Sequence, residues 1–206
     1  MSQPRVQVPA ADTHTVILDA AQTRLLEFGY HKTTMAEIAS DCGMSAANLY
    51  RYFANKEEIA AECATRCMNE RLERLRPIVE DSHTNAADKL LAYALMLVDD
   101  SHALAGRDSK IGELVATITH HRPALVHEKL AIHHRFLAAI LEQGRTAGEF
   151  DYVDAETTAR DLHTVLTLFD VPLFVGLFDR AEFERRARGV VAIVLDGLRP
   201  RPRRRR

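Results

Sequence analysis

Polar and cationic side chains crowd the stretch from Ser45 to Lys56. Among them, the amide of Asn48 can pair bidentately with the N6 and N7 edge of adenine, the contact by which asparagine reads a base in the major groove. Hydroxyl, phenol and ammonium groups suit phosphate oxygens, which fix the register of a protein on a duplex without reading its sequence. The candidate phosphate contacts are Thr33, Thr34, Tyr50, Tyr52 and Lys56; the other candidate DNA contacts are Ser45, Ala46, Ala47, Asn48 and Arg51.

Two short helices joined by a turn must position these side chains. The first begins at a threonine, and its apolar residues occupy the i, i+3, i+4 and i+7 positions of one face: Met35, Ile38, Ala39 and Cys42. Gly43 then supplies a left-handed turn residue, and Ser45 can cap the second helix, in which Leu49 and Phe53 face inward. This pattern is typical of a helix-turn-helix, although amphipathic helices with a glycine turn also occur in domains that never touch nucleic acid.

A third amphipathic helix upstream covers the other two, and Gly29 ends it. With it, the segment from about Thr13 to Ala60 resembles the DNA-binding domain of the TetR family of bacterial repressors. The residues that carry the resemblance, all at the family's spacing, are Ala20, Ala21, Phe28, Gly29, Tyr30, Thr33, Thr34, Ile38, Ala39, Gly43, Ser45, Leu49, Tyr50, Phe53 and Lys56. The sequence departs from the family at Ala47, where glycine is frequent, and at Ala46, where a basic or polar residue is frequent. Which bases are read is therefore open.

The resemblance implies an all-α protein with an N-terminal three-helix helix-turn-helix domain and a C-terminal helical ligand-binding and dimerisation domain. It also implies a sequence-specific transcriptional regulator, namely a repressor that leaves a palindromic operator when a small-molecule effector binds and shifts the helix linking the two domains. The expected partners are double-stranded DNA, a second copy of the chain and an unidentified effector, and no membrane. An effector-independent architectural DNA-binding protein is the alternative.

The composition favours the same fold class. The chain has 206 residues, of which 47% are hydrophobic, and no stretch alternates convincingly as a strand would. No apolar run reaches the roughly 18 residues of a membrane span, and the first residues lack the layout of a signal peptide. Three cysteines do not suggest a disulfide framework. We therefore expect a cytoplasmic protein.

Charge is distributed unevenly along the chain. The formal net charge is −2 although residues 199–206 carry six arginines, and residues 1–56 hold five basic and five acidic side chains. DNA affinity must then come from the placement of charge rather than from its total. The arginine tail is either a non-specific DNA anchor or a flexible, solvated end.

The predicted organisation has four parts. They are a flexible N-terminal arm at 1–12, the helix-turn-helix domain at 13–56, a regulatory and dimerisation domain at 57–198, and the Arg-rich tail at 199–206. A linker helix opens the regulatory domain and runs to Pro77. Further helices are predicted at 86–104, 109–120, 123–147, 154 to about 178, and 181–198.

Two sets of mainly apolar residues in the regulatory domain are candidates for binding surfaces. The last two predicted helices favour a four-helix dimer interface, whose candidate residues are Leu162, Val165, Leu166, Phe169, Leu173, Gly189, Val190, Ile193 and Val194. An apolar wall with a few polar groups is typical of an effector pocket, whose candidate residues are Tyr93, Met96, Thr117, His121, Phe136, Ile140, Phe169 and Phe174. Both sets are also compatible with the core of a single chain, but a dimer is favoured because one head alone would contact too few bases.

Histidine and cysteine raise the alternative of a metal, haem or redox sensor. The chain has ten histidines, and Cys63 and Cys67 stand at i, i+4. A core pair of thiols is favoured over a shared metal because no further ligand lies nearby in the sequence. No resident metal or cofactor is predicted. Neither is an enzyme, because His127 and Glu128 begin a stretch in which a zinc protease would need histidine at Ala131.

Overall fold

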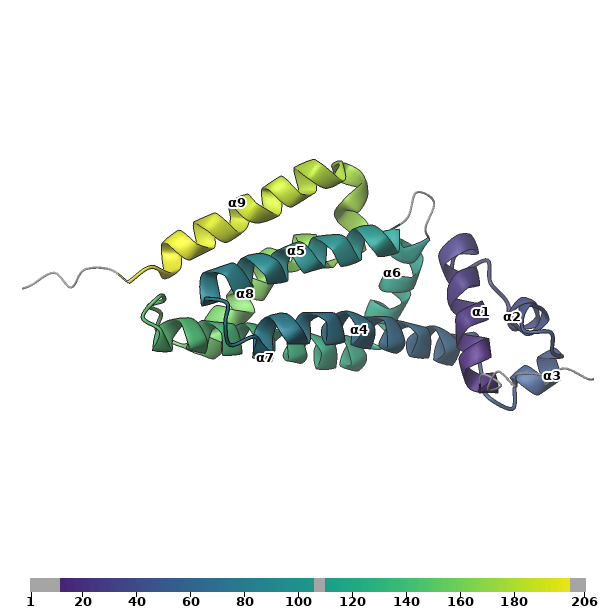
Figure 1. Cartoon of the computed structure of the whole chain (residues 1–206). Coiled ribbons are helices and arrows are strands. Elements are labelled where there is room, and N and C mark those ends of the chain that lie inside the picture. Colours follow the sequence, from purple (N-terminus) through teal and green to yellow (C-terminus); the bar gives the residue numbers. More distant parts are fainter. Residues whose placement is uncertain (1–11, 106–109, 201–206) are drawn as a thin grey trace, which may run out of the picture.

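The computed structural model describes residues 12–105 and 110–200. All regular elements in these two ranges are helical. The predicted N-terminal arm lies outside the described residues except for Asp12, and so does the Arg-rich tail except for Arg199 and Pro200. The molecule is elongated, with α1 to α3 at one end and α9 toward the other (Figure 1). In the described ranges, no helix is both long and apolar enough to cross a membrane.

Three helices form the N-terminal helix-turn-helix domain, called the head below: α1 (Thr13–Phe28), α2 (Met35–Asp41) and α3 (Ala46–Leu49). A complete capping box starts α2, in which the Thr34 hydroxyl accepts from the Glu37 backbone and the Glu37 carboxylate accepts from the Thr34 backbone. Gly43 has a φ of 67° in the turn, and the Ser45 side chain caps α3. Each capping and turn position is thus filled by a residue that its backbone geometry favours.

Helix α4 (Lys56–Glu80) connects the head to the rest of the molecule. Its N-cap is Asn55, whose side chain accepts from the backbone of Glu58. The prediction that this helix stops at Pro77 was wrong by one turn. An interior proline loses one backbone hydrogen bond and crowds the preceding turn. The last turn is kept nevertheless, because Val79 is buried and Asp81 donates its N–H to the Pro77 carbonyl at 3.0 Å.

The regulatory part adds five α-helices and a short 3₁₀ helix. They are α5 (Ala86–Ala105), α6 (Ile111–His121), α7 (Pro123–Thr146), α8 (Ala155–Asp170), η1 (Pro172–Leu177) and α9 (Arg180–Leu198). Helix α7 packs along α8, and α5 packs along α9. Helix α8 ends earlier than its predicted end near residue 178, because Pro172 disfavours helical geometry in the residue before it, and Val171 is extended.

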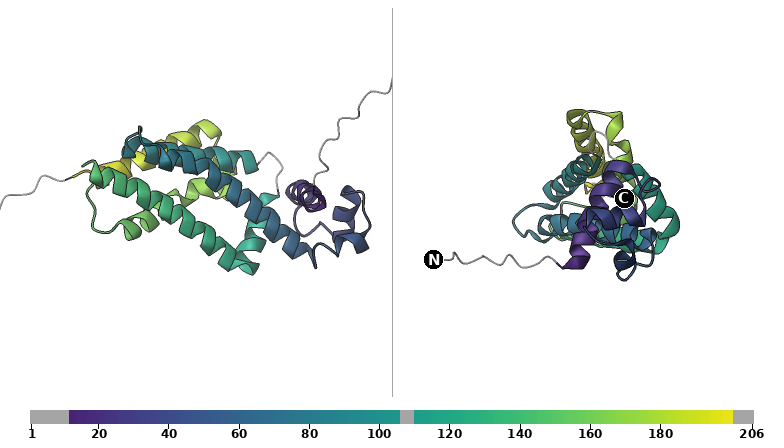
Figure 2. Two further views of the ribbon diagram at one scale, coloured as in Figure 1. Left: turned by 60° about the horizontal axis from the view of Figure 1, so that its bottom comes forward. Right: turned by 90° about the vertical axis from the view of Figure 1, so that its right-hand side faces the viewer.

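Two apolar cores hold the molecule together. The larger lies among α5, α7, α8 and α9 and includes Tyr93, Leu97 and Phe169. The smaller joins α1 to α3 with the first turns of α4 and with one face of α6, through Leu114 and Ile118. Figure 2 shows α4 running from the head into the regulatory helices. Helix α6 is therefore packed against the head as well as against its own domain.

Candidate nucleic-acid interface and regulatory cavity

The tip of the head presents an exposed polar surface. Tyr50, Arg51 and Tyr52 are exposed there, on a turn that prolongs α3 through hydrogen bonds from the backbone of Arg51 and Tyr52 to the carbonyls of Asn48 and Leu49. Ser45 and Ala47 are also exposed, and Ala46 is half-buried. These residues of the predicted DNA-binding set therefore lie together on one accessible end of the molecule.

Asn48 is half-buried rather than fully exposed. Its backbone N–H donates to the Ser45 hydroxyl at 3.2 Å, and its side-chain amide lies 3.8 Å from the Met44 sulfur. A thioether is a weak acceptor, so this contact leaves the amide free to exchange partners. The base-reading role of Asn48 stays a prediction.

Thr33 and Lys56 make hydrogen bonds within the head, and their predicted phosphate contacts stay predictions. The Thr33 side chain is 1% exposed and donates to the Gly29 carbonyl at 2.8 Å. The Lys56 ammonium donates to the carbonyls of Tyr30 at 2.6 Å and Thr33 at 2.7 Å, and lies 4.2 Å from the centre of the Tyr30 ring. Burial lowers the pKa of Lys56 from its usual value. The lysine fastens the start of α4 to the loop between α1 and α2.

Helix α6 is hydrogen-bonded to the head. The N–H of Lys110, which precedes α6, donates to the Leu26 carbonyl of α1 at 2.8 Å. The Glu113 carboxylate accepts from the backbone N–H of His31 at 3.3 Å. Gly29 has a φ of 90°, and a Cβ placed there would lie 2.5 Å from a Glu113 oxygen. This contact could not be inferred from local sequence patterns, because Gly29 and Glu113 are far apart in the chain.

A cavity of about 180 Å³ lies between α4, α6, α7 and the junction of α8 with η1. Its walls are mainly apolar, and the polar side chains that reach it are Arg71, Lys129, His133, Asp170 and Thr119. The apolar lining residues include Met68, Ile111, Leu114, Val115, Ile118, Val126, Leu130 and Pro172. A larger and more polar groove of about 840 Å³ runs along the outside of α4 beside α1 and α5.

The predicted effector-pocket residues do not line this cavity. All eight lie in the described part of the chain, and none of them is among the lining residues: Tyr93, Met96, Thr117, His121, Phe136, Ile140, Phe169 and Phe174. Tyr93, Ile140 and Phe169 are fully buried in the larger core, whereas His121 and Phe174 are exposed. Helical periodicity identifies a buried face but not whether that face meets another helix or an empty space.

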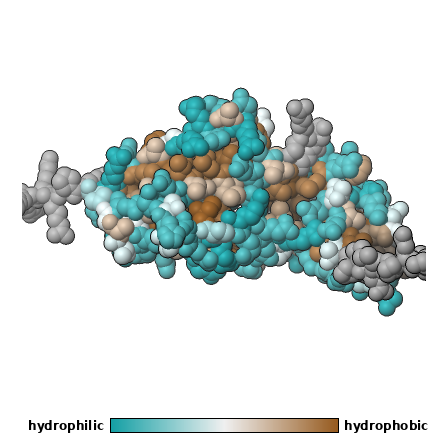
Figure 3. Space-filling model, in the orientation of Figure 1, coloured by the Kyte–Doolittle hydropathy of each residue, from teal (hydrophilic) through white to brown (hydrophobic). Residues whose placement is uncertain are grey.

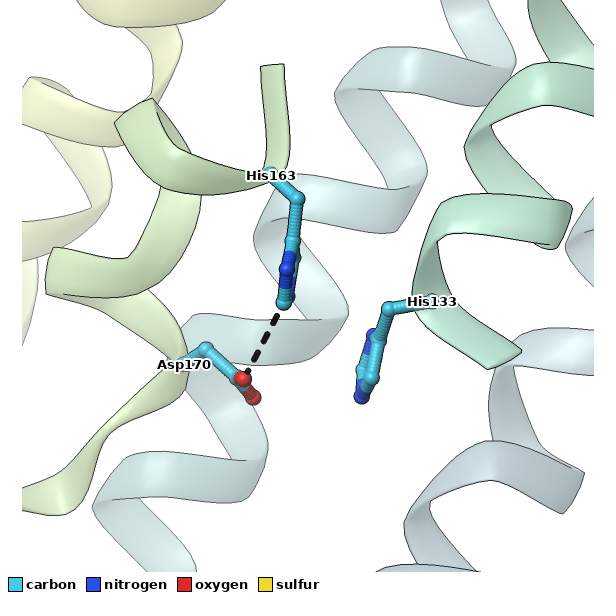
Figure 4. Close-up of side chains that lie close together, drawn as sticks. All are labelled: His133, His163 and Asp170. Atoms are coloured by element: carbon cyan, nitrogen blue, oxygen red, sulfur yellow. Dashed lines mark ion pairs between the residues drawn. The ribbon is translucent and has the colours of Figure 1, made fainter. Parts of the chain in front are cut away.

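A buried polar cluster lies at one wall of the cavity. Figure 4 shows His133 of α7 beside His163 and Asp170 of α8. The two imidazole rings are nearly parallel, at 14°, with their centres 4.7 Å apart. The Tyr93 hydroxyl is 2.5 Å from His133 Nδ1, and Arg71 Nη2 donates to Asp170 Oδ1 at 2.7 Å. Four helices, α4, α5, α7 and α8, thus contribute to one polar network.

Burial and neighbouring charge set the protonation of this cluster. Burial lowers the pKa of His133 to about 4, so the ring is neutral near pH 7. Burial alone would raise the pKa of Asp170, but His163 and the Arg71 guanidinium outweigh that effect and hold it well below its usual value. The network therefore contains a neutral imidazole beside a carboxylate that stays charged.

The cysteines that raised the redox alternative are protonated thiols. Cys63 is buried in the smaller core, and burial raises the pKa of its thiol to about 12. Cys67 lies on the cavity wall, and burial raises its pKa as well. Because the thiolate is the form that binds soft metals and reacts with oxidants, this environment disfavours both roles near neutral pH.

The predicted dimer residues fall into two groups. Leu162, Leu166 and Phe169 are buried within the single chain, so the surface of the single chain does not present them to a partner. They stand at i, i+4 and i+7 and form the inner face of α8. Val165 is 48% exposed, Leu173 51% and Ile193 74%. Gly189 is exposed, and Val190 and Val194 are half-buried.

Apolar side chains also reach the surface elsewhere. On the face drawn in Figure 3, hydrophobic residues gather over α5 and beside α9, while the surface over α4 is largely hydrophilic. Exposed apolar side chains occur in both parts of the molecule, since Val16 and Phe28 of the head are exposed as well as Leu173 and Ile193 of the regulatory part.

Comparison with known proteins identifies the family. Residues 17–63 match the family described as "Bacterial regulatory proteins, tetR family", and residues 86–191 match "Tetracyclin repressor-like, C-terminal domain". The chain is 33% identical over 90 residues to the fatty acid metabolism regulator protein of Bacillus subtilis (strain 168), an alignment that covers 44% of each chain and so spans less than half the length of that relative.

Two longer alignments extend over nearly the whole molecule. The HTH-type transcriptional regulator RutR of Escherichia coli (strain K12) is 27% identical over 194 residues, 90% of each chain. The crystal structure of the transcriptional regulator FadR from Bacillus subtilis in complex with stearoyl-CoA superposes with a TM-score of 0.66 at 22% identity, covering 90% of this chain and 99% of that one. The exposed helix-turn-helix, the helical regulatory part and both family matches establish that the chain belongs to the TetR family of helix-turn-helix transcriptional regulators.

Proposed function

We propose that the protein is a homodimeric repressor that binds a palindromic operator and is released from it by a small molecule in the cavity between α4, α6, α7 and α8. One observation carries this proposal: α6 forms a wall of the cavity and is also hydrogen-bonded to the head. Leu114 and Ile118 line the cavity, while Lys110 and Glu113 of the same region contact Leu26 and His31.

The coupling follows from this shared helix. A ligand changes DNA affinity only if it binds one of two conformations better than the other. A molecule that displaces the cavity face of α6 also displaces the start of that helix, which is hydrogen-bonded to Leu26 and His31 of the head. The conformation with the ligand then carries the head in a different position relative to its operator.

The lining of the cavity limits the class of effector. Its volume of about 180 Å³ is below the roughly 300–1,000 Å³ of pockets for drug-sized ligands. We infer a small, mainly apolar molecule with one hydrogen-bonding group that faces the polar wall at Lys129 and His133. The complex of FadR with stearoyl-CoA supports an apolar effector, although that whole ligand requires more space than this cavity offers.

A dimer is supported by exposed apolar residues of the regulatory part. Val165, Leu173 and Ile193 project from α8, η1 and α9, where a second copy can cover them. Two heads related by two-fold symmetry read two half-sites about one helical turn apart, so the operator is a palindrome.

Selection of bound duplexes from a random DNA pool by the purified full-length chain tests the DNA-binding part. We expect enrichment of a palindrome, and sedimentation of the complex as two chains per duplex. A chain with Tyr50→Ala and Arg51→Ala is the matched control, because both side chains are exposed and neither substitution removes a core contact. No enrichment by the unmodified chain would contradict sequence-specific regulation and favour an architectural role.

The effector part is tested separately on the enriched operator. Candidate apolar acids, alcohols and amides are titrated into the complex, and DNA release is followed by fluorescence anisotropy. Leu114→Trp fills the cavity from α6, whereas Val153→Trp alters a fully exposed residue. We expect the first variant to respond less to an active compound and the second to respond normally. Equal responses would place the effector elsewhere.

A further inference from the structure

We propose that His133, His163 and Asp170 bind a divalent transition ion such as Zn²⁺ at the polar wall of the cavity. One potential ligand atom from each residue lies within 4.8 Å of the other two. Both histidines are buried, and Asp170 is half-buried. Two imidazoles with one carboxylate form a ligand set for Zn²⁺ or Fe²⁺ that leaves coordination positions open.

The unpartnered nitrogen of His163 is the second observation. His163 Nε2 is buried, and no group in the described ranges shares a hydrogen bond with it. The nearest Asp170 oxygen is 3.7 Å away, which is beyond hydrogen-bond distance. A buried polar atom without a partner is costly, and a cation between His163 and Asp170 would satisfy both.

The neighbouring side chains orient the other two ligands. Tyr93 shares a hydrogen bond with Nδ1 of His133, so Nε2 of that ring can bind a metal in the tautomer in which Nδ1 carries the proton and donates to the phenol oxygen. Arg71 holds Asp170 by Oδ1, which leaves Oδ2 on the side of His163. Such outer contacts, which fix the tautomer and direction of each ligand, accompany most metal sites in proteins.

The nearby positive charges are paired with carboxylates. Arg71 lies between Asp170 and the buried Asp100, whose oxygen is 3.5 Å from Arg71 Nε and which also contacts the half-exposed Arg74. Lys129 pairs with Glu128 at 2.8 Å. The carboxylates of Asp100 and Asp170 therefore offset the positive charge of the Arg71 guanidinium beside the site. Because Arg71 bonds to one oxygen of Asp170, the second oxygen can still bind a cation.

The site needs a small closure to hold an ion. Ligand atoms at bonds of about 2.0–2.1 Å in a tetrahedron are about 3.4 Å apart, whereas here they lie within 4.8 Å. The nearly parallel rings must also turn about their Cβ–Cγ bonds, a rotation with a broad and shallow energy profile. His133 and Asp170 line the cavity and His163 does not, so the open coordination position faces the cavity.

Metal titration of the full-length, metal-free chain tests the proposal without any DNA. We expect Zn²⁺ to bind in calorimetry with one tight site per chain, and Co²⁺ to give visible absorption bands of a four- or five-coordinate site. Intense near-ultraviolet bands would indicate a thiolate ligand from Cys67, and they are not expected. Their appearance, or the absence of a one-to-one site, would overturn the proposal.

Variants separate this site from surface histidines. His163→Gln and His133→Gln should each weaken Zn²⁺ binding at least tenfold. The matched control changes His120 and His121, an exposed adjacent pair, to glutamine and should leave the tight site intact. Unchanged affinity in both single variants would refute the assignment.

A spectroscopic measurement on the unmodified chain covers the case in which those variants fail to fold. X-ray absorption of the Zn²⁺-loaded protein should show two imidazole ligands, with nitrogen and oxygen as the only donor atoms and no sulfur in the coordination shell. Fewer than two imidazoles would refute the site regardless of how the variants behave.

Discussion

The backbone N–H of Lys110 donates a 2.8 Å hydrogen bond to the carbonyl of Leu26, which joins the start of α6 to the last turn of α1. Glu113 adds a second bond, to the N–H of His31, one helical turn further on. The cavity wall and the reading head are therefore in direct contact through residues more than 80 positions apart in the chain.

Gly29→Ala should destabilise the fold by about 1–3 kcal/mol, because it places a side chain at positive φ and against the Glu113 carboxylate. The free energy of unfolding in urea measures the loss. Gly148→Ala is the matched control, since Gly148 has a φ of 75° but open space around its Cβ position. The difference between the two variants reports the clash. In a chain that also carries Glu113→Ala, the loss of stability caused by Gly29→Ala should be smaller, whereas the loss caused by Gly148→Ala should be unchanged. If Gly29→Ala costs the same free energy with and without Glu113, the Glu113 side chain is not what the new methyl group meets.

Lys56→Ala should lower the stability of the head by about 1.5–3 kcal/mol, because its ammonium bonds two carbonyls. It should leave the salt dependence of DNA binding unchanged. Arg51→Ala, at an exposed position, should instead reduce the slope of log affinity against log salt by about one. Affinity measurements from low to moderate salt distinguish the two effects. A reduced slope in the Lys56 variant would restore its role as a phosphate contact.

Asn48→Ala should cost about 1–3 kcal/mol at one base pair of the operator and relax the preference there. The contact of its amide with the Met44 sulfur is weak enough to be exchanged for a base edge. Competition binding with operators altered at each position is the measurement. If the preference is unchanged at every position, Asn48 does not read a base.

Stability should fall as the pH drops from 6.5 toward 4. Burial lowers the pKa of His133 from 6.5 to about 4. Between these two pH values His133 is protonated in the unfolded chain but neutral in the folded chain. The loss approaches about 3 kcal/mol when that window has been crossed. Urea unfolding in the presence of a chelator at pH 7 and pH 4.5 measures it. His133→Gln should flatten the dependence, leaving the smaller contributions of His102 and His134, whose pKa values burial also lowers.

Ile193→Asp should shift the protein toward monomer, because a charge at a 74% exposed apolar position of α9 would be buried in a dimer. Sedimentation velocity over a range of protein concentrations is the test. Val153→Asp, at a fully exposed residue of the connection before α8, should leave the association unchanged. A dimer of undiminished affinity in the Ile193 variant would exclude α9 from the interface.

Local signals in the sequence predict the helices well. Ser45 caps α3 as expected, Thr34 is the threonine that starts α2, and Gly29 and Gly43 occupy turns with positive φ. These features depend on neighbours within four residues, and so they can be read from the sequence. The fold class follows from them, and the comparisons confirm it.

The cavity could not be predicted in this way, because it depends on which helices meet. Phe169 and Val165 both look like interface residues of α8, yet Phe169 is fully buried and Val165 half exposed. The i, i+4, i+7 spacing of Leu162, Leu166 and Phe169 was the available signal for an inner face. His163 and Asp170 likewise share a face of α8, but only the packing of α7 on α8 brings His133 beside them.

The hydrogen bonds of Lys56 to the loop between α1 and α2 couple the head to α4, so a tilt of α4 would move the head. At 1.5 Å per residue, the fifteen positions from Lys56 to Arg71 span about 22 Å. Arg71 holds Asp170 beside the cavity, so it is a natural pivot. A tilt of about 5° there would move the head about 2 Å, because Lys56 keeps head and helix rigidly joined. In the proposed dimer, opposite movements of the two chains would add, so a small rotation beside the cavity would displace the two heads by about 4 Å relative to their grooves.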